Sequence, residues 1–125
     1  MITPEAKPSP FKFEDLPIYQ EVLSWINEVY SLTTAWPKEE QFGLTGQLRR
    51  AAVSIALNIS EGSGRTNKDF SHFLSTARGS CYECATFITI AKNQNYVNYQ
   101  EFEHHYDKCN KIARTLNVLR TSIKS

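Results

Sequence analysis

The chain has 125 residues, of which 41% are hydrophobic and 22% charged, and this composition fits a single ordinary globular domain. Its 14 Lys and Arg residues against 13 Asp and Glu residues give a net charge of +1, which excludes a strongly electrostatic nucleic-acid binder of the histone type. The chain has three cysteines and no signal peptide at the N-terminus, which argues against a disulfide-bonded secreted domain. It has no run of about 20 apolar residues, which argues against a membrane-spanning chain. We therefore expect a cytoplasmic protein with free thiols.

The N-terminal segment contains three prolines, which lack a backbone donor and block regular structure. We therefore predict a flexible tail over residues 1–13 and one bundle domain over residues 14–125. Pro17 fits the first turn of a helix, where its missing N–H costs nothing, and Asp15 is the expected cap.

Apolar residues then recur at the three- and four-residue spacing of helices in four runs, at residues 18–32, 42–59, 70–91 and 102–123. Pro37 ends the first run, and Gly62 is placed to be the C′ residue after the second. The third run ends near Asn93, and Asn98 with Glu101 forms a capping-box pattern before the fourth. No stretch alternates with period two, so the sequence predicts an all-α protein, an antiparallel up-down-up-down four-helix bundle.

The second predicted helix carries a narrow polar stripe beside its apolar face. Arg50, Ser54, Asn58 and Glu61 fall in one column at about 100° per residue. Asparagine and serine are poor mid-helix residues, and a buried polar group without a partner costs about 1–3 kcal/mol. We predict a structural network at a helix–helix or subunit contact, in which Glu61 pairs with Arg50 or with Arg78. A ligand or catalytic pocket is the alternative, but one carboxylate without a nearby histidine or activated nucleophile argues against it.

A second constellation combines cysteine and histidine. Cys81-x-x-Cys84 precedes His104, His105 and Cys109, and antiparallel helices would bring these groups near each other as possible zinc ligands. Structural zinc cysteines usually lie on turns, however, and both members of the pair fall on the apolar stripe, where cysteine behaves as a small hydrophobe. We therefore predict core packing for this cluster, with no metal or other cofactor.

The string GLTGQLRRAAVSIALNISEGSGR, followed by DFSHFLSTARGSCYECATFITIAKNQNYV, resembles the bacterial four-helix bundle proteins first described in intervening sequences of 23S ribosomal RNA genes. The segments FEDLPIYQ and WPKEEQFGL fit the same pattern, and the resemblance runs from near Phe13 to near Leu119. It implies an up-down bundle that assembles as a ring-shaped homopentamer, mostly without demonstrated activity. One branch resembles the accessory variability determinant of diversity-generating retroelements, which binds nucleic acid and reverse transcriptase through a basic surface. Other members are suspected of binding the ribosomal RNA insert that encodes them.

The resemblance and the lack of catalytic groups favour a non-enzymatic, homo-oligomeric scaffold whose main partner is itself. The alternative is weak binding of RNA or DNA, or of a reverse transcriptase, through basic patches repeated in every copy. The near-zero net charge departs from the basic branch, and no membrane partner or small-molecule substrate is evident. Arg49 is expected to face a partner more freely than Arg50. The basic residues proposed for such patches are Arg49, Arg65, Lys68, Lys108, Lys111, Arg114, Arg120 and Lys124.

Overall fold

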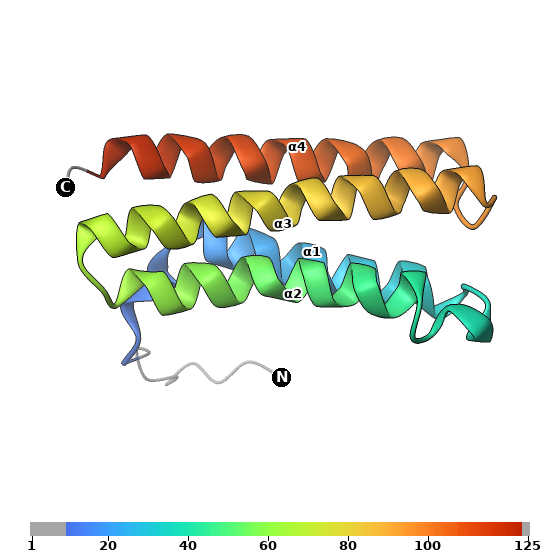
Figure 1. The fold of residues 1–125 in the computed structure, drawn as a ribbon, viewed down its shortest axis with the longest axis horizontal. Helices are drawn as coiled ribbons and strands as arrows, with labels where there is room; N and C mark the ends of the chain where they lie inside the picture. The colour runs from blue at the N-terminus through green and yellow to red at the C-terminus, as the bar shows by residue number, and fades with distance from the viewer. Residues whose placement is uncertain (1–9, 124–125) are drawn as a thin grey trace, which may run out of the picture.

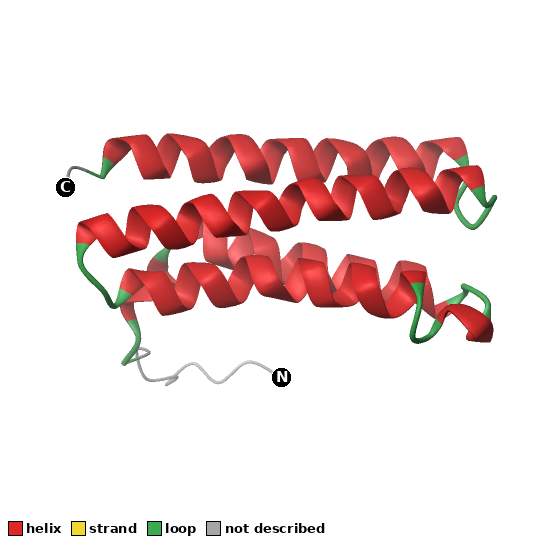
Figure 2. Ribbon diagram, in the orientation of Figure 1, coloured by secondary structure: helices red, strands yellow, loops and turns green. Residues whose placement is uncertain are grey.

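Four long helices make up the protein, whose computed structural model describes residues 10–123. The elements in chain order are η1 (Lys12–Asp15), α1 (Pro17–Thr34), η2 (Lys38–Glu40), α2 (Leu44–Ser63), α3 (Asn67–Asn93) and α4 (Tyr99–Ser122). Consecutive helices run in opposite directions (Figure 1). The predicted all-α four-helix bundle is confirmed, and the described part of the chain contains no strand (Figure 2).

Two of the helix starts follow the sequence signals. Pro17 occupies the first position of α1, although Leu16 is the N-cap and Asp15 lies in η1 instead of capping. Before α4, the side chain of Asn98 accepts from the backbone N–H of Glu101 at 2.8 Å, and the Glu101 carboxylate accepts from the backbone N–H of Asn98 at 2.9 Å. This is the predicted capping box, which satisfies two helix-terminal donors.

The N-terminal segment joins the bundle through aromatic packing. Residues 1–9 of the predicted tail, like Lys124 at the other end, lie outside the described residues. Phe13 in η1 packs edge-on against Tyr19 of α1, with ring centroids 5.0 Å apart. The chain is therefore held against α1 before the first long helix begins.

Gly62 has a different role from the predicted one. It lies inside α2, the helix ends one residue before Gly64, and no glycine in residues 10–123 has a positive φ. A Cβ atom on Gly62 would lie 2.5 Å from the Cβ of Phe73 and 3.0 Å from the Cδ1 of Phe70. The position requires glycine because α2 and α3 approach closely there, not because the chain turns left-handed.

The apolar faces of all four helices meet in one core. Its largest fully buried side chains include Trp25, Leu48, Ile55, Ile59, Leu74, Ile88, Ile112 and Leu116. Burying an aliphatic side chain of this size contributes about 1.5–3 kcal/mol, so this core supplies the main stabilisation of the bundle. Within residues 10–123, no helix combines the length and apolar character that crossing a bilayer requires.

Candidate functional site

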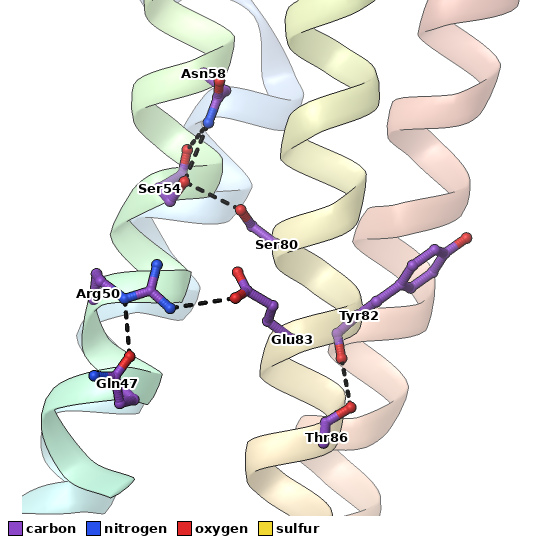
Figure 3. Close-up of polar contacts among 8 residues, drawn as sticks. All are labelled: Gln47, Arg50, Ser54, Asn58, Ser80, Tyr82, Glu83 and Thr86. Carbon is purple, nitrogen blue, oxygen red and sulfur yellow. Dashed lines mark hydrogen bonds and ion pairs between the residues drawn. The ribbon is translucent and has the colours of Figure 1, made fainter. Parts of the chain in front are cut away.

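The polar stripe of α2 forms a hydrogen-bonded seam with α3 (Figure 3). The amide of Asn58 donates to the carbonyl oxygen of Ser54 at 2.8 Å and to its Oγ at 3.1 Å. Across the interface, the buried Ser80 hydroxyl donates to Ser54 Oγ at 3.1 Å. Because a slip of one helix past the other would break this bond, the seam fixes the register of α2 against α3.

The charged members of the stripe do not pair as expected. Arg50 donates to Gln47 at 3.1 Å and forms an ion pair with Glu83 of α3 at 3.3 Å (Figure 3). Glu61 pairs with Arg65, four residues on and just past the end of α2, at 3.6 Å. The predicted pairing of Glu61 with Arg50 or with Arg78 is therefore wrong. Arg50 pairs with Glu83 instead, and Glu61 pairs with Arg65.

Arg49 and Arg78 also have unexpected partners. The Nε of Arg49 donates to the hydroxyl of Thr33 at 2.8 Å, and its guanidinium lies 4.4 Å from the ring centroid of Tyr30. The expectation that Arg49 is the freer arginine is wrong, because it is held against α1 whereas Arg50 is half exposed. Arg78 donates to the side-chain oxygen of Asn117 in α4 at 2.7 Å. It lies about 200° around α3 from Ser80, so it faces α4 and not the stripe.

The cysteine and histidine cluster considered for zinc is not assembled. Cys81, Cys84 and Cys109 are buried, and burial raises the pKa of Cys81 to about 12 and the pKa of the other two thiols as well. The three thiols are therefore part of the apolar core, where cysteine packs as a small hydrophobic residue. The potential metal ligands that do come together in residues 10–123 are Glu28, His104 and His105. Their ligand atoms lie within 4.8 Å of one another.

This second group joins α1 to α4 through hydrogen bonds. His104 Nε2 lies 2.6 Å from a carboxylate oxygen of Glu28. The buried His105 ring accepts at Nδ1 from the indole N–H of Trp25 at 3.0 Å. Because an indole N–H can only donate, Nδ1 must be unprotonated, and neutral His105 carries its proton on Nε2. A metal ion at Nε2 would require loss of that proton or of the Trp25 bond, so the group is suited to connecting the helices and poorly suited to ligating a metal.

The outer side of α3 and α4 carries a groove formed by three neighbouring hollows. Its central floor consists of small side chains, Cys81, Ala85, Cys109 and Ala113, with Tyr82 and Tyr106 beside them. Tyr82 points from α3 toward α4, away from the polar seam (Figure 3). Tyr82 is 59% exposed and Tyr106 44% exposed. The two flanking hollows extend the groove to Ile90 at one end and to Val118 at the other.

The basic residues proposed for binding divide into paired and unpaired groups. Lys111 pairs with Glu21 at 3.7 Å, and Arg65 pairs with Glu61. Among residues 10–123, no carboxylate lies within 4.0 Å of the charged atoms of Lys68, Lys108, Arg114 or Arg120. The unpaired cations therefore lie mainly on the second half of α4 and at the start of α3.

Comparison with known proteins adds to this geometry. The profile of the 23S rRNA-intervening sequence protein family matches residues 14–118. The chain belongs to this family. No curated protein matches it. A crystal structure of a protein with unknown function, from the S23 ribosomal protein family of Bacteroides thetaiotaomicron VPI-5482, is similar with a TM-score of 0.77 and 17% identity, over 86% of this chain and 98% of that one. At this identity the likeness shows the shared fold.

Two features of this intervening-sequence protein were missed by reasoning from the sequence. The Trp25–His105 bond joins residues 80 positions apart, and only the core spacing of both residues hints at it. The groove was missed because helical spacing does not show how much of Tyr82 and Tyr106 the packed helices leave exposed. The small residues Ala85 and Ala113 on facing helices were the signal that the two helices leave space above them.

Proposed function

We propose that this family member is a non-enzymatic, cytoplasmic scaffold that assembles with copies of itself into a ring, with five subunits. The observation that supports this proposal is the apolar groove between α3 and α4. Its small-residue floor and two exposed tyrosines form a contiguous apolar surface, and such surfaces commonly mark sites of protein association. Tyrosine is also enriched at the centres of protein interfaces.

A ring requires a head-to-tail contact, in which two different faces of neighbouring copies meet. The acidic residues of α1 do not supply one of these faces, because within one copy Glu21 pairs with Lys111 and Glu28 bonds to His104. The described second half of α4, from Lys108 onward, carries basic residues and no acidic one. When two different, complementary faces of one chain meet in neighbouring copies, the assembly is heterologous and closes into a ring if the rotation allows it.

Sedimentation equilibrium of the full chain at micromolar concentration tests the assembly. We expect a single species at five times the monomer mass of 14.3 kDa. A specific interface of the usual size buries about 800 Å² per partner. A monomer would refute the ring, and a stable assembly with another subunit number would refute the pentamer.

A second candidate function is weak binding of RNA or DNA, and a reverse transcriptase is a further possible partner of the same surface. The unpaired Lys108 and Arg114 support this function, because cations without carboxylate partners are available to phosphates. Repetition of the patch around a ring would add binding energy by multivalency. A mobility-shift titration across salt tests it: we expect affinity to fall as salt rises, and no shift at low salt would refute it.

A further inference from the structure

Two arginines converge on one neutral acceptor at the end of the groove. Arg78 of α3 donates to the Oδ1 of Asn117 at 2.7 Å, and Arg120 of α4 donates to the same oxygen at 3.1 Å. The start of α3 and the end of α4 lie side by side at this end of the bundle (Figure 1). An amide oxygen has two lone pairs, so it can accept both bonds, but it brings no negative charge to offset two guanidinium groups.

Two other arginines of the chain have carboxylate partners. Arg50 and Arg65 each lie within 4.0 Å of a carboxylate, those of Glu83 and Glu61. Among residues 10–123, neither Arg78 nor Arg120 has such a partner. Guanidinium groups that are partly buried and lack a counter-charge are unfavourable, because their mutual repulsion is poorly screened away from solvent.

Arg120 has an additional unsatisfied group. Its Nε is buried and has no hydrogen-bond partner in the described part of the chain. The Arg120 side chain lines a hollow together with Lys68, His72, Ser71, Ser75 and Asp69. This hollow offers hydroxyl donors and a second cation, with Asp69 as its single carboxylate. Arg78, Arg114 and Asn117 line the hollow at the Val118 end of the groove, so each arginine of the pair lines a hollow of its own.

We infer that Arg78 and Arg120, bridged by Asn117, form a binding site for an oxyanion of the phosphate class. A phosphate oxygen accepts from guanidinium N–H groups in a planar, two-pronged geometry, and it supplies both the missing charge and an acceptor for the buried Nε. Lys68 and the two serines of the hollow complete the set of donors. This inference does not depend on assembly of the chain, since all of these residues belong to one copy.

Thermal unfolding of the full chain in phosphate tests the site, with chloride at matched ionic strength and equal protein concentration as reference. At a phosphate concentration ten times its Kd, we expect the Tm to rise by about 5 °C above the chloride value. Asn117→Asp places a carboxylate between the two arginines. We expect this variant to be more stable than the native chain in chloride and to show no response to phosphate.

Arg50→Gln is the matched control, because it removes one positive charge from an arginine that already has a carboxylate partner, Glu83. We expect this variant to respond to phosphate as the native chain does. An equal response in Asn117→Asp, or a native Tm no higher in phosphate than in chloride, would overturn the site.

The phosphate group has two possible sources, a free anion or the backbone of a nucleic acid. Fluorescence anisotropy with a short single-stranded RNA separates them. If the source is a nucleic acid, we expect Asn117→Asp to weaken RNA binding by about tenfold or more and Arg50→Gln to change it little. If Asn117→Asp loses the phosphate response but binds RNA as tightly as the native chain, the result supports the site and shows that its ligand is a free oxyanion.

Discussion

Helix α3 has two interfaces that differ in kind. Toward α2, it is closed: Ser80 bonds across the seam, Glu83 pairs with Arg50, and Phe73 fits against the bare backbone of Gly62. Toward α4, small side chains leave an open groove beside two exposed tyrosines. The comparison indicates that the bundle separates two tasks along one helix. The α2 side holds the fold, and the α4 side is the one that we propose for contacts between copies.

The largest effect is expected where α2 and α3 approach most closely. Gly62→Ala places a methyl group 2.5 Å from the Cβ of Phe73, and both backbones must shift to relieve the overlap. We expect a loss of about 1–3 kcal/mol in the free energy of unfolding, measured by urea denaturation.

Gly79→Ala is the matched control for that substitution. Gly79 lies in α3 with no atom within 4 Å of an added Cβ, so alanine should raise stability by about 0.5–1 kcal/mol through helix propensity alone. Two equal effects of the same sign would contradict the close approach of α2 and α3.

The seam between α1 and α4 predicts a dependence of stability on pH. Burial, followed by the nearby His104, lowers the pKa of His105, with smaller opposing effects from Glu28 and Glu101. The unfolded chain therefore binds more protons than the folded chain as pH falls below about 6.5, and the free energy of unfolding decreases in that range. Protonation of Nδ1 also breaks the Trp25 bond.

Urea denaturation at pH 7.5 and pH 5.5 measures this effect, and His105→Asn provides the comparison. Asparagine retains an acceptor for the Trp25 indole but does not titrate, so the variant should lose a part of the pH dependence that the native chain shows. A variant with the full native pH dependence would show that the titration of other groups is responsible.

A smaller effect is expected in the polar seam of α2 and α3. Ser54→Ala removes the acceptor of the buried Ser80 hydroxyl and one partner of Asn58, which should cost about 1 kcal/mol without changing the assembly state. Ser60→Ala removes only a bond to the carbonyl of Leu57 within the same exposed turn, so it should have a smaller effect on the unfolding free energy. Loss of assembly in Ser54→Ala would place the seam at a subunit contact.

Helical spacing, turn residues and the capping box predicted the four helices because these signals are local in the chain. The same reasoning identified Ser54 and Asn58 as partners in a structural seam, since their helical positions decide which face they share. It failed for Gly62, whose role depends on the distance to Phe73 of another helix. It also failed for Arg49 and Arg78, because long side chains choose among several partners that only the packed bundle brings within reach.

The division of tasks along α3 is tested most directly by Tyr82→Lys, measured by sedimentation equilibrium and thermal unfolding together. Tyr82 lies beside the groove and is 59% exposed, so lysine should leave the bundle folded with a Tm close to the native value. Tyr99→Lys, at an equally exposed tyrosine away from the groove, is the control. We expect Tyr82→Lys to be a folded monomer and Tyr99→Lys to assemble as the native chain does. A Tyr82→Lys chain that still assembles would contradict the division of tasks along α3.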